Sequence, residues 1–112
     1  MSKLNEFVSY VVELMQSVGP VEAKRMFGGY GVFLEGLMFA LIADEVLYLK
    51  ADKTTVEDFQ ALDLEAFTYM KKGKPCVLQY YQAPEHTLED VEAMTLWADR
   101  AYKVAQRAAR KK

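Results

Sequence analysis

Residues 35 to 45 read Glu35-Gly36-Leu37-Met38-Phe39-Ala40-Leu41-Ile42-Ala43-Asp44-Glu45, an apolar run between two short polar turns. An uninterrupted apolar run of this length is typical of a strand in the middle of a sheet, covered on both faces. Glu35-Gly36 and Asp44-Glu45 are turn signals, and short turns join neighbouring antiparallel strands. The stretch therefore predicts a central strand with a hairpin partner on each side.

The sequence on either side of this run continues the sheet. Tyr30, Val32 and Phe33 are strand-forming residues that lead into Glu35-Gly36, which we expect to be the first hairpin turn. After the second turn, Val46, Tyr48 and Lys50 alternate with Leu47, Leu49 and Ala51, which predicts a strand with one more polar face. Two further strands are predicted at Phe67 to Met70 and at Val77 to Tyr81, joined by the tip Lys71-Lys72-Gly73-Lys74.

Three segments have the periodicity of amphipathic helices. The first covers residues 2–18, with Ser2 as N-cap, Gly19-Pro20 as stop and a stripe made of Leu4, Phe7, Val8, Val11, Met15 and Val18. Thr54-Thr55-Val56-Glu57 has the capping-box pattern and predicts a short second helix. The last helix is predicted to start at Thr87-Leu88-Glu89-Asp90, with an inner stripe of Val91, Met94, Ala98, Ala101, Ala105 and Ala108. The predicted order is α-β-β-β-α-β-β-α, a two-layer α+β fold whose antiparallel sheet is covered by helices.

Length and composition set the class of protein. A chain of 112 residues with 52% hydrophobic residues fits a single domain, residues 1–112, with its own core. Cys76 is the only cysteine, so no internal disulfide forms, which fits a reducing compartment. The polar start and the shortness of every apolar run predict neither a signal peptide nor a membrane helix. We expect a soluble, cytoplasmic protein that has no membrane partner.

The residues do not assemble a recognisable catalytic inventory. His86, the only histidine, follows Pro84-Glu85 at the start of a helix, where an exposed turn residue is favoured over a general base. Cys76 begins an apolar strand, which favours a buried structural thiol over a reactive one. One His and one Cys do not make a structural zinc site. The expectation is a non-enzymatic protein with no catalytic, cofactor-binding or metal-binding residues, and a small-ligand or thiol-dependent function is the weaker alternative.

Two surfaces have the composition of binding sites. The first is a candidate interaction surface where cations adjoin aromatic residues and glycines, made of Lys24, Arg25, Phe27, Gly28, Gly29 and Tyr30. Its alternative interpretation is an amphipathic edge strand whose glycines permit a bulge or a close backbone approach, which is favoured over a phosphate-binding loop. The second comprises candidate nucleic-acid contacts at Lys71, Lys72, Lys74, Arg107 and Arg110. Its alternatives are a solvated hairpin tip and a basic helix end that complements the helix dipole.

The segment Ala23-Lys24-Arg25-Met26-Phe27-Gly28-Gly29-Tyr30-Gly31-Val32-Phe33 resembles the signature of the TfoX/Sxy family N-terminal domain. The resemblance continues through Gly36 to Asp44, Leu47 to Lys50, Phe67 to Tyr69, Tyr80-Tyr81 and Pro84, and so spans nearly the whole chain. It implies a bacterial regulatory protein of DNA uptake competence, a transcriptional co-activator that works with the cyclic AMP receptor protein and is not an enzyme. It also implies an arrangement similar to secretion chaperone-like folds.

The resemblance also frames what partners to expect. Family regulators carry a second, C-terminal domain that resembles a helix-hairpin-helix module, whereas the printed sequence ends at Lys112, so we expect a stand-alone or excised N-terminal domain. A protein partner, in the transcription machinery or similar to the cyclic AMP receptor protein, is the leading expectation. Direct nucleic-acid binding through Lys24, Arg25 and the basic C-terminal helix is the alternative. Pairing of two chains is left open.

Overall fold

The computed structural model describes residues 3–26 and 28–110, with side chains from Glu6 on. Its elements in chain order are α1 (Lys3–Met15), β1 (Glu22–Met26), β2 (Gly29–Leu34), β3 (Leu37–Ala43), β4 (Val46–Lys50), α2 (Val56–Ala61), β5 (Ala66–Lys71), β6 (Lys74–Gln82), a 3-10 helix η1 (Glu85–Leu88) and α3 (Val91–Arg110). The predicted α+β class and order of elements are confirmed. The structure adds β1 ahead of the three strands expected before α2.

The described strands form one antiparallel sheet in the order β1-β2-β3-β4-β6-β5. The apolar run Leu37–Ala43 is β3 and lies inside the sheet, with its consecutive residues 39–42 all buried. Its central position, covered on both faces, is confirmed. In β4 and the residue after it, Leu47, Leu49 and Ala51 are buried while the intervening side chains are partly exposed, as the alternation predicts.

The hairpin turns explain where the strands reverse. Glu35-Gly36, Asp44-Glu45 and Lys72-Gly73 all have positive φ angles at both positions, the geometry that matches the twist of paired strands. These three turns confirm the predicted turn positions. The prediction that Glu35-Gly36 is the first hairpin turn is wrong, because β1 and β2 already form a hairpin ahead of it, with Met26 opposite Gly29.

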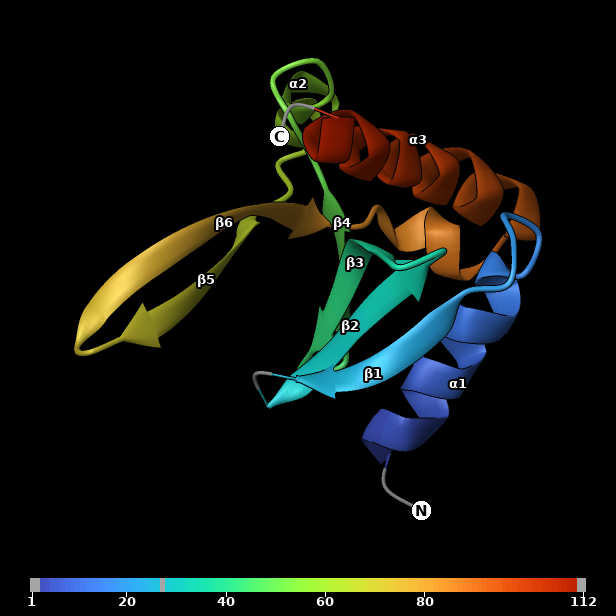
Figure 1. Ribbon diagram of the computed structural model, residues 1–112, viewed down its shortest axis with the longest axis horizontal. Coiled ribbons are helices and arrows are strands. Elements are labelled where there is room, and N and C mark those ends of the chain that lie inside the picture. Colours follow the sequence, from blue (N-terminus) through green and yellow to red (C-terminus); the bar gives the residue numbers. More distant parts are fainter. Residues whose placement is uncertain (1–2, 27, 111–112) are drawn as a thin grey trace.

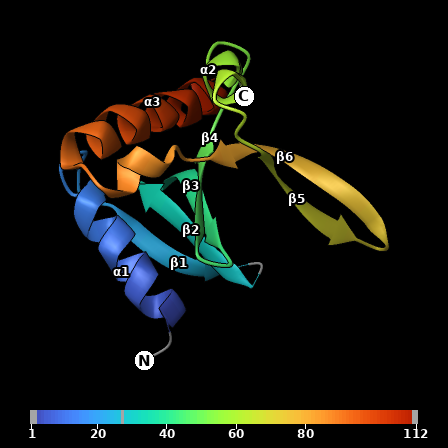
Figure 2. The ribbon, with the colours of Figure 1, turned by 180° about the vertical axis from the view of Figure 1, so that it is seen from behind.

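The helices α1 and α3 cover one face of the sheet and enclose the core, as Figures 1 and 2 show from opposite sides. From α1, Val11 and Met15 are fully buried against strand residues such as Val32 and Phe39. The rings of Phe39 and Tyr102 meet edge to face at 5.9 Å, and Trp97 meets Phe59 of α2 at 5.2 Å. Aromatic contacts of this kind add to the burial of apolar surface.

Several predicted helix details differ from the structure. The first helix ends at Met15 because a turn closes over residues 16–18, while the expected N-cap Ser2 lies outside the described residues. In α3, Val91 and Ala108 are exposed whereas Val104 is buried, because the ends of this long helix extend past the sheet it covers. The predicted start at residues 87–90 is instead the 3-10 helix η1 and a turn.

The capping-box prediction at Thr54–Glu57 is wrong. The N-cap of α2 is Thr55, whose side chain makes no capping hydrogen bond. Thr54 instead donates from both its backbone N–H and its hydroxyl to the Asp52 carboxylate, at 3.0 and 2.6 Å. A side-chain turn of this type competes with helix capping for the same Thr hydroxyl.

Strands β5 and β6 belong to the same sheet, but their outer ends extend past β4 as a two-stranded ribbon. β6 pairs with β4 only through Tyr80, Tyr81 and Gln82, whereas its pairing with β5 runs out to Lys71 opposite Lys74. Both views show this hairpin projecting from the helix-covered part of the molecule (Figures 1 and 2). We call residues 67–78 the arm and the remaining described residues the body.

Candidate interaction surfaces

The predicted interaction surface lies on the hairpin formed by β1 and β2. β1 is an edge strand within the described sheet, and Lys24 and Arg25 are exposed on it. Lys24 Nζ lies 5.1 Å from the centre of the Phe33 ring, a cation–π contact that holds the lysine against the sheet. Phe27 lies outside the described residues. The edge-strand interpretation of Lys24 and Arg25 is confirmed, and it is compatible with a binding role.

The glycines of this segment have structural reasons to be glycine. A Cβ atom on Gly29 would collide with the backbone carbonyl oxygen of Ile42 on β3, and one on Gly31 would lie 2.5 Å from the sulfur of Met26. Close approach of the β3 backbone therefore accounts for Gly29, as the sequence alternative predicted, whereas at Gly31 the nearest neighbour is a flexible methionine side chain. Gly28 is different, because it is exposed, has a φ of 75° and has open space around its Cα.

Tyr30 contributes little exposed surface to the site. It is partly buried and packs against the hydrophobic core, opposite Arg25 on β1 and Ile42 on β3. Of the six predicted interaction residues, the structure therefore presents three on the described surface, Lys24, Arg25 and Gly28.

The predicted nucleic-acid contacts are divided between two places. Lys71, Lys72 and Lys74 are exposed at the tip of the arm, and Arg110 is exposed at the end of α3. The arm tip and the end of α3 lie far apart in both views (Figures 1 and 2). Arg107 is engaged within the molecule, since it forms an ion pair with Asp52 at 3.0 Å and donates to the Thr54 hydroxyl at 3.0 Å. The five residues therefore do not form a single basic surface.

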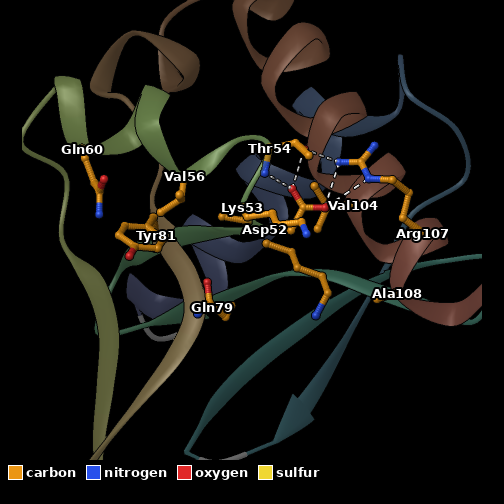
Figure 3. Close-up of a pocket in the computed structure, with 12 residues that line it drawn as sticks. Asp52, Lys53, Thr54, Val56, Gln60, Gln79, Tyr81, Val104, Arg107 and Ala108 are labelled. Atoms are coloured by element: carbon orange, nitrogen blue, oxygen red, sulfur yellow. Dashed lines mark hydrogen bonds and ion pairs between the residues drawn. The ribbon is translucent and has the colours of Figure 1, made fainter. Parts of the chain in front are cut away.

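Sequence reasoning missed an open cleft of about 700 Å³ where β4, α2, β6 and α3 meet. Figure 3 shows Arg107 reaching from α3 to Asp52 and Thr54 at its edge, with Gln60, Gln79 and Tyr81 on the opposite side. The Asp-Lys-Thr spacing of residues 52–54 is the signal that indicates the side-chain turn, but nothing local to it points to Arg107 on the last helix.

Burial and hydrogen bonding act in opposite directions on the acid in this cleft. Burial by itself raises the pKa of Asp52, but hydrogen bonds from Thr54 and Arg107 and the charge of Arg107 outweigh it, so the pKa is lowered. At Lys50, which also lines the cleft, burial lowers the pKa and the Asp52 charge partly offsets that effect. The cleft has the volume of a small-molecule site, and Asp52 and Arg107 neutralise each other in it, while Lys50 and Lys53 add positive charge to its lining.

The two residues considered for catalysis lie on different elements. Cys76 is partly buried on β6 opposite Tyr69, whereas His86 is exposed in η1 with its ring centre 6.4 Å from that of Trp97. The exposed position predicted for His86 is confirmed. Among residues 3–26 and 28–110, no three metal-ligating side chains gather at one point. In the same part of the chain, no helix combines the length and apolarity needed to cross a membrane.

The comparisons with known proteins agree with the sequence signature. The chain is 34% identical over 86 residues to the DNA transformation protein TfoX1 of Aliivibrio fischeri, which covers 76% of this chain and 39% of that protein. It is 29% identical over 73 residues to protein Sxy of Escherichia coli, covering 65% and 35%. It is 36% identical over 81 residues to the DNA transformation protein TfoX of Haemophilus influenzae, covering 70% and 37%.

The chain therefore spans less than two fifths of the length of these curated relatives. The TfoX N-terminal domain family, in contrast, matches most of this chain. The match covers residues 13–105, from the last turn of α1 to the last turns of α3. The protein belongs to the TfoX N-terminal domain family.

Proposed function

We propose that this chain is a non-enzymatic regulatory domain that acts in DNA uptake competence by binding a protein partner. Membership of the TfoX N-terminal domain family supports this proposal, as does similarity to two relatives named DNA transformation proteins. The partner class that fits the family resemblance is a transcription regulator similar to the cyclic AMP receptor protein. The domain then acts as a co-activator that changes the partner's activity at a subset of promoters.

The observation that carries the proposal is the exposed edge strand β1. Within the described sheet, β1 pairs with β2 alone, so a partner strand has an edge on which to extend the sheet. Arg25 is exposed on this edge, and arginine is enriched in protein interfaces because its planar head group bonds and stacks at once. The exposed Gly28 beside it leaves the backbone accessible at the adjacent turn.

Binding of the purified chain to the cyclic AMP receptor protein of a competence-forming bacterium tests this proposal, with isothermal calorimetry as the readout. We expect Arg25→Glu to weaken binding at least about tenfold, as loss of one interface anchor does. Arg110→Glu is the matched control, because it makes the same charge change at another exposed arginine and should bind as the native chain does.

A reporter gene under a competence promoter provides the functional half of the test. Expression of the native chain and of Arg110→Glu should raise the reporter signal, whereas Arg25→Glu should not. Equal binding by all three proteins would show that β1 is not the contact surface. Absence of binding by the native chain, together with an unchanged reporter signal, would contradict the co-activator function itself.

A further inference from the structure

The arm, residues 67–78, is not part of the β1 edge to which the proposed function assigns partner binding. Its two strands are joined by the register pairs Tyr69–Cys76 and Lys71–Lys74 on one face and Thr68–Val77 and Met70–Pro75 on the other. The Gln79 carbonyl accepts a hydrogen bond from Ala51 N–H at 2.8 Å. From Gln79 towards the tip, β6 pairs with β5 alone in the described structure. The arm is therefore a two-stranded ribbon that is anchored at its base, where the Phe67 ring meets the Tyr48 ring of β4 edge to face at 5.1 Å, and that extends away from the body towards its tip (Figure 1).

Charge on the arm is separated from charge on the body. Lys71, Lys72 and Lys74 lie in a stretch, residues 66–84, that contains no Asp or Glu, although the whole chain has 16 acidic residues and a net charge of −2. The described structure shows no ion pair at these three exposed lysines, whereas Arg100, Lys103 and Arg107 on α3 all have carboxylate partners. The tip therefore presents three uncompensated cations to an anionic partner.

The same ribbon exposes apolar side chains along one face, opposite the face that carries Lys71 and Lys74. Met70 is 65% exposed and Val77 is 66% exposed, the two highest values among the large hydrophobic residues of the described chain, and Pro75 is exposed between them. Lysines alone would protect a strand edge from aggregation. Lysines combined with an exposed apolar row instead suit a partner that offers both negative charge and apolar contact.

From this combination, we propose that the arm binds duplex DNA by lying in the major groove. The major groove admits a two-stranded β-ribbon, with phosphates along its walls and base edges, including thymine methyl groups, on its floor. The face that carries Met70, Pro75 and Val77 then lies against the base edges, while Lys71 and Lys74 on the outer face and Lys72 at the turn extend sideways to the phosphates that flank the groove. This assignment moves DNA contact from the basic end of α3, where Arg107 is already paired, to the arm.

The order of residues along the arm favours DNA over an anionic membrane surface. The lysines form the tip itself and the apolar residues lie behind them, so entering a bilayer tip first would bury charge before any apolar side chain. A ribbon that lies lengthwise in a groove places both kinds of side chain against their preferred surroundings.

Fluorescence anisotropy of a labelled 30-base-pair duplex, titrated with the 112-residue chain from 50 to 200 mM KCl, tests the proposal. Three phosphate contacts give a slope of about −3 when the logarithm of the binding constant is plotted against that of salt concentration. The triple variant Lys71→Gln/Lys72→Gln/Lys74→Gln should lose at least about tenfold in affinity at 50 mM KCl and most of the slope.

Two further variants separate the arm from general electrostatics. The control Lys53→Gln/Lys103→Gln removes charge from two exposed lysines of the body and should keep affinity within about twofold. Met70→Ala/Val77→Ala should weaken binding several-fold without changing the salt slope, because it removes base-edge contact and no phosphate contact. Both of its side chains are exposed, so the fold should survive, which circular dichroism checks.

Three results would overturn the proposal. The first is that the native chain fails to bind the duplex at 50 mM KCl, and the second is that the body variant Lys53→Gln/Lys103→Gln loses as much affinity as the arm triple variant. The third is that vesicles containing anionic lipid, or single-stranded DNA of the same length, bind as tightly as the duplex. No protein partner is present in this assay, so its outcome is independent of the co-activator proposal.

Discussion

The body and the arm are parts of one sheet, but the body buries its apolar side chains whereas the arm exposes several of them. In the body, strands come so close that Gly29 has no room for a side chain against β3, and Val32 is completely buried. In the arm, the strands leave the apolar side chain of Val77 66% exposed and place three lysines at the tip. The comparison indicates that apolar content in the body serves stability, whereas apolar content in the arm is available for binding.

The largest effect is expected where the body is tightest. Gly29→Ala places a Cβ atom against the carbonyl oxygen of Ile42, and because both groups belong to paired backbones, neither can move without disturbing β3. We expect a loss of about 3 kcal/mol in the free energy of unfolding, at the upper end of the overpacking range. Urea denaturation followed by circular dichroism measures it.

Gly28→Ala is the control for that substitution. Gly28 has open space around it and only its φ of 75° disfavours a side chain, so we expect a loss of about 1 kcal/mol. If the two alanine variants are equally destabilised, the backbone contact with Ile42 does not explain why residue 29 is glycine.

A matched pair of valines tests the contrast between body and arm directly. Val32 of β2 is fully buried and Val77 of β6 is 66% exposed, although both lie in strands. Val32→Ala should lower the free energy of unfolding by about 2 kcal/mol, because it loses burial and leaves a cavity. Val77→Ala should change it by less than about 0.5 kcal/mol. Similar losses in urea denaturation would mean that the arm packs on the body in solution.

The sequence predicts those parts of the fold that local patterns determine. The apolar run of β3, the turns at Glu35-Gly36 and Lys72-Gly73 and the stripes of α1 and α3 each have a signal within a few residues. β1 has a weaker signal, the amphipathic edge-strand pattern, because Glu-Ala-Lys-Arg-Met holds no β-branched or aromatic residue, and its pairing with β2 makes it a strand. Local context also overrides the Thr54 capping pattern, since Asp52 is the nearer partner for that hydroxyl.

The candidate surfaces depend more on long-range structure. The pattern of residues 67–70 and 77–81 predicts strands like those of the core. It does not reveal that, near the hairpin tip, these two strands pair only with each other. Likewise, Arg107 has a basic side chain typical of a phosphate contact, and only the fold brings it to Asp52, 55 residues away in sequence. The exposed positions of Lys24, Arg25 and the tip lysines were predictable because hairpin ends and edges lie at the surface.

The smallest effect is expected at the junction of the two regions, where Arg107 of α3 holds the Asp52 segment that leads from β4 towards the arm. The Asp52 pKa is lowered in the folded chain, so the unfolded chain binds more protons near the ordinary value of 3.8. The ion pair therefore stabilises the fold above that pH and loses its contribution as pH falls through the lowered value. Both side chains are about one third exposed, which limits the contribution to less than about 1 kcal/mol.

Asp52→Asn tests this junction through the pH dependence of unfolding. The native chain should be more stable than the variant at pH 7, and the difference should disappear towards pH 2, where the native carboxyl is protonated as well. If the native chain is still more stable than Asp52→Asn at pH 2, the charge of Asp52 is not the cause. The stabilisation would then come from the hydrogen bonds of the Thr54 turn, which do not require a charged carboxyl.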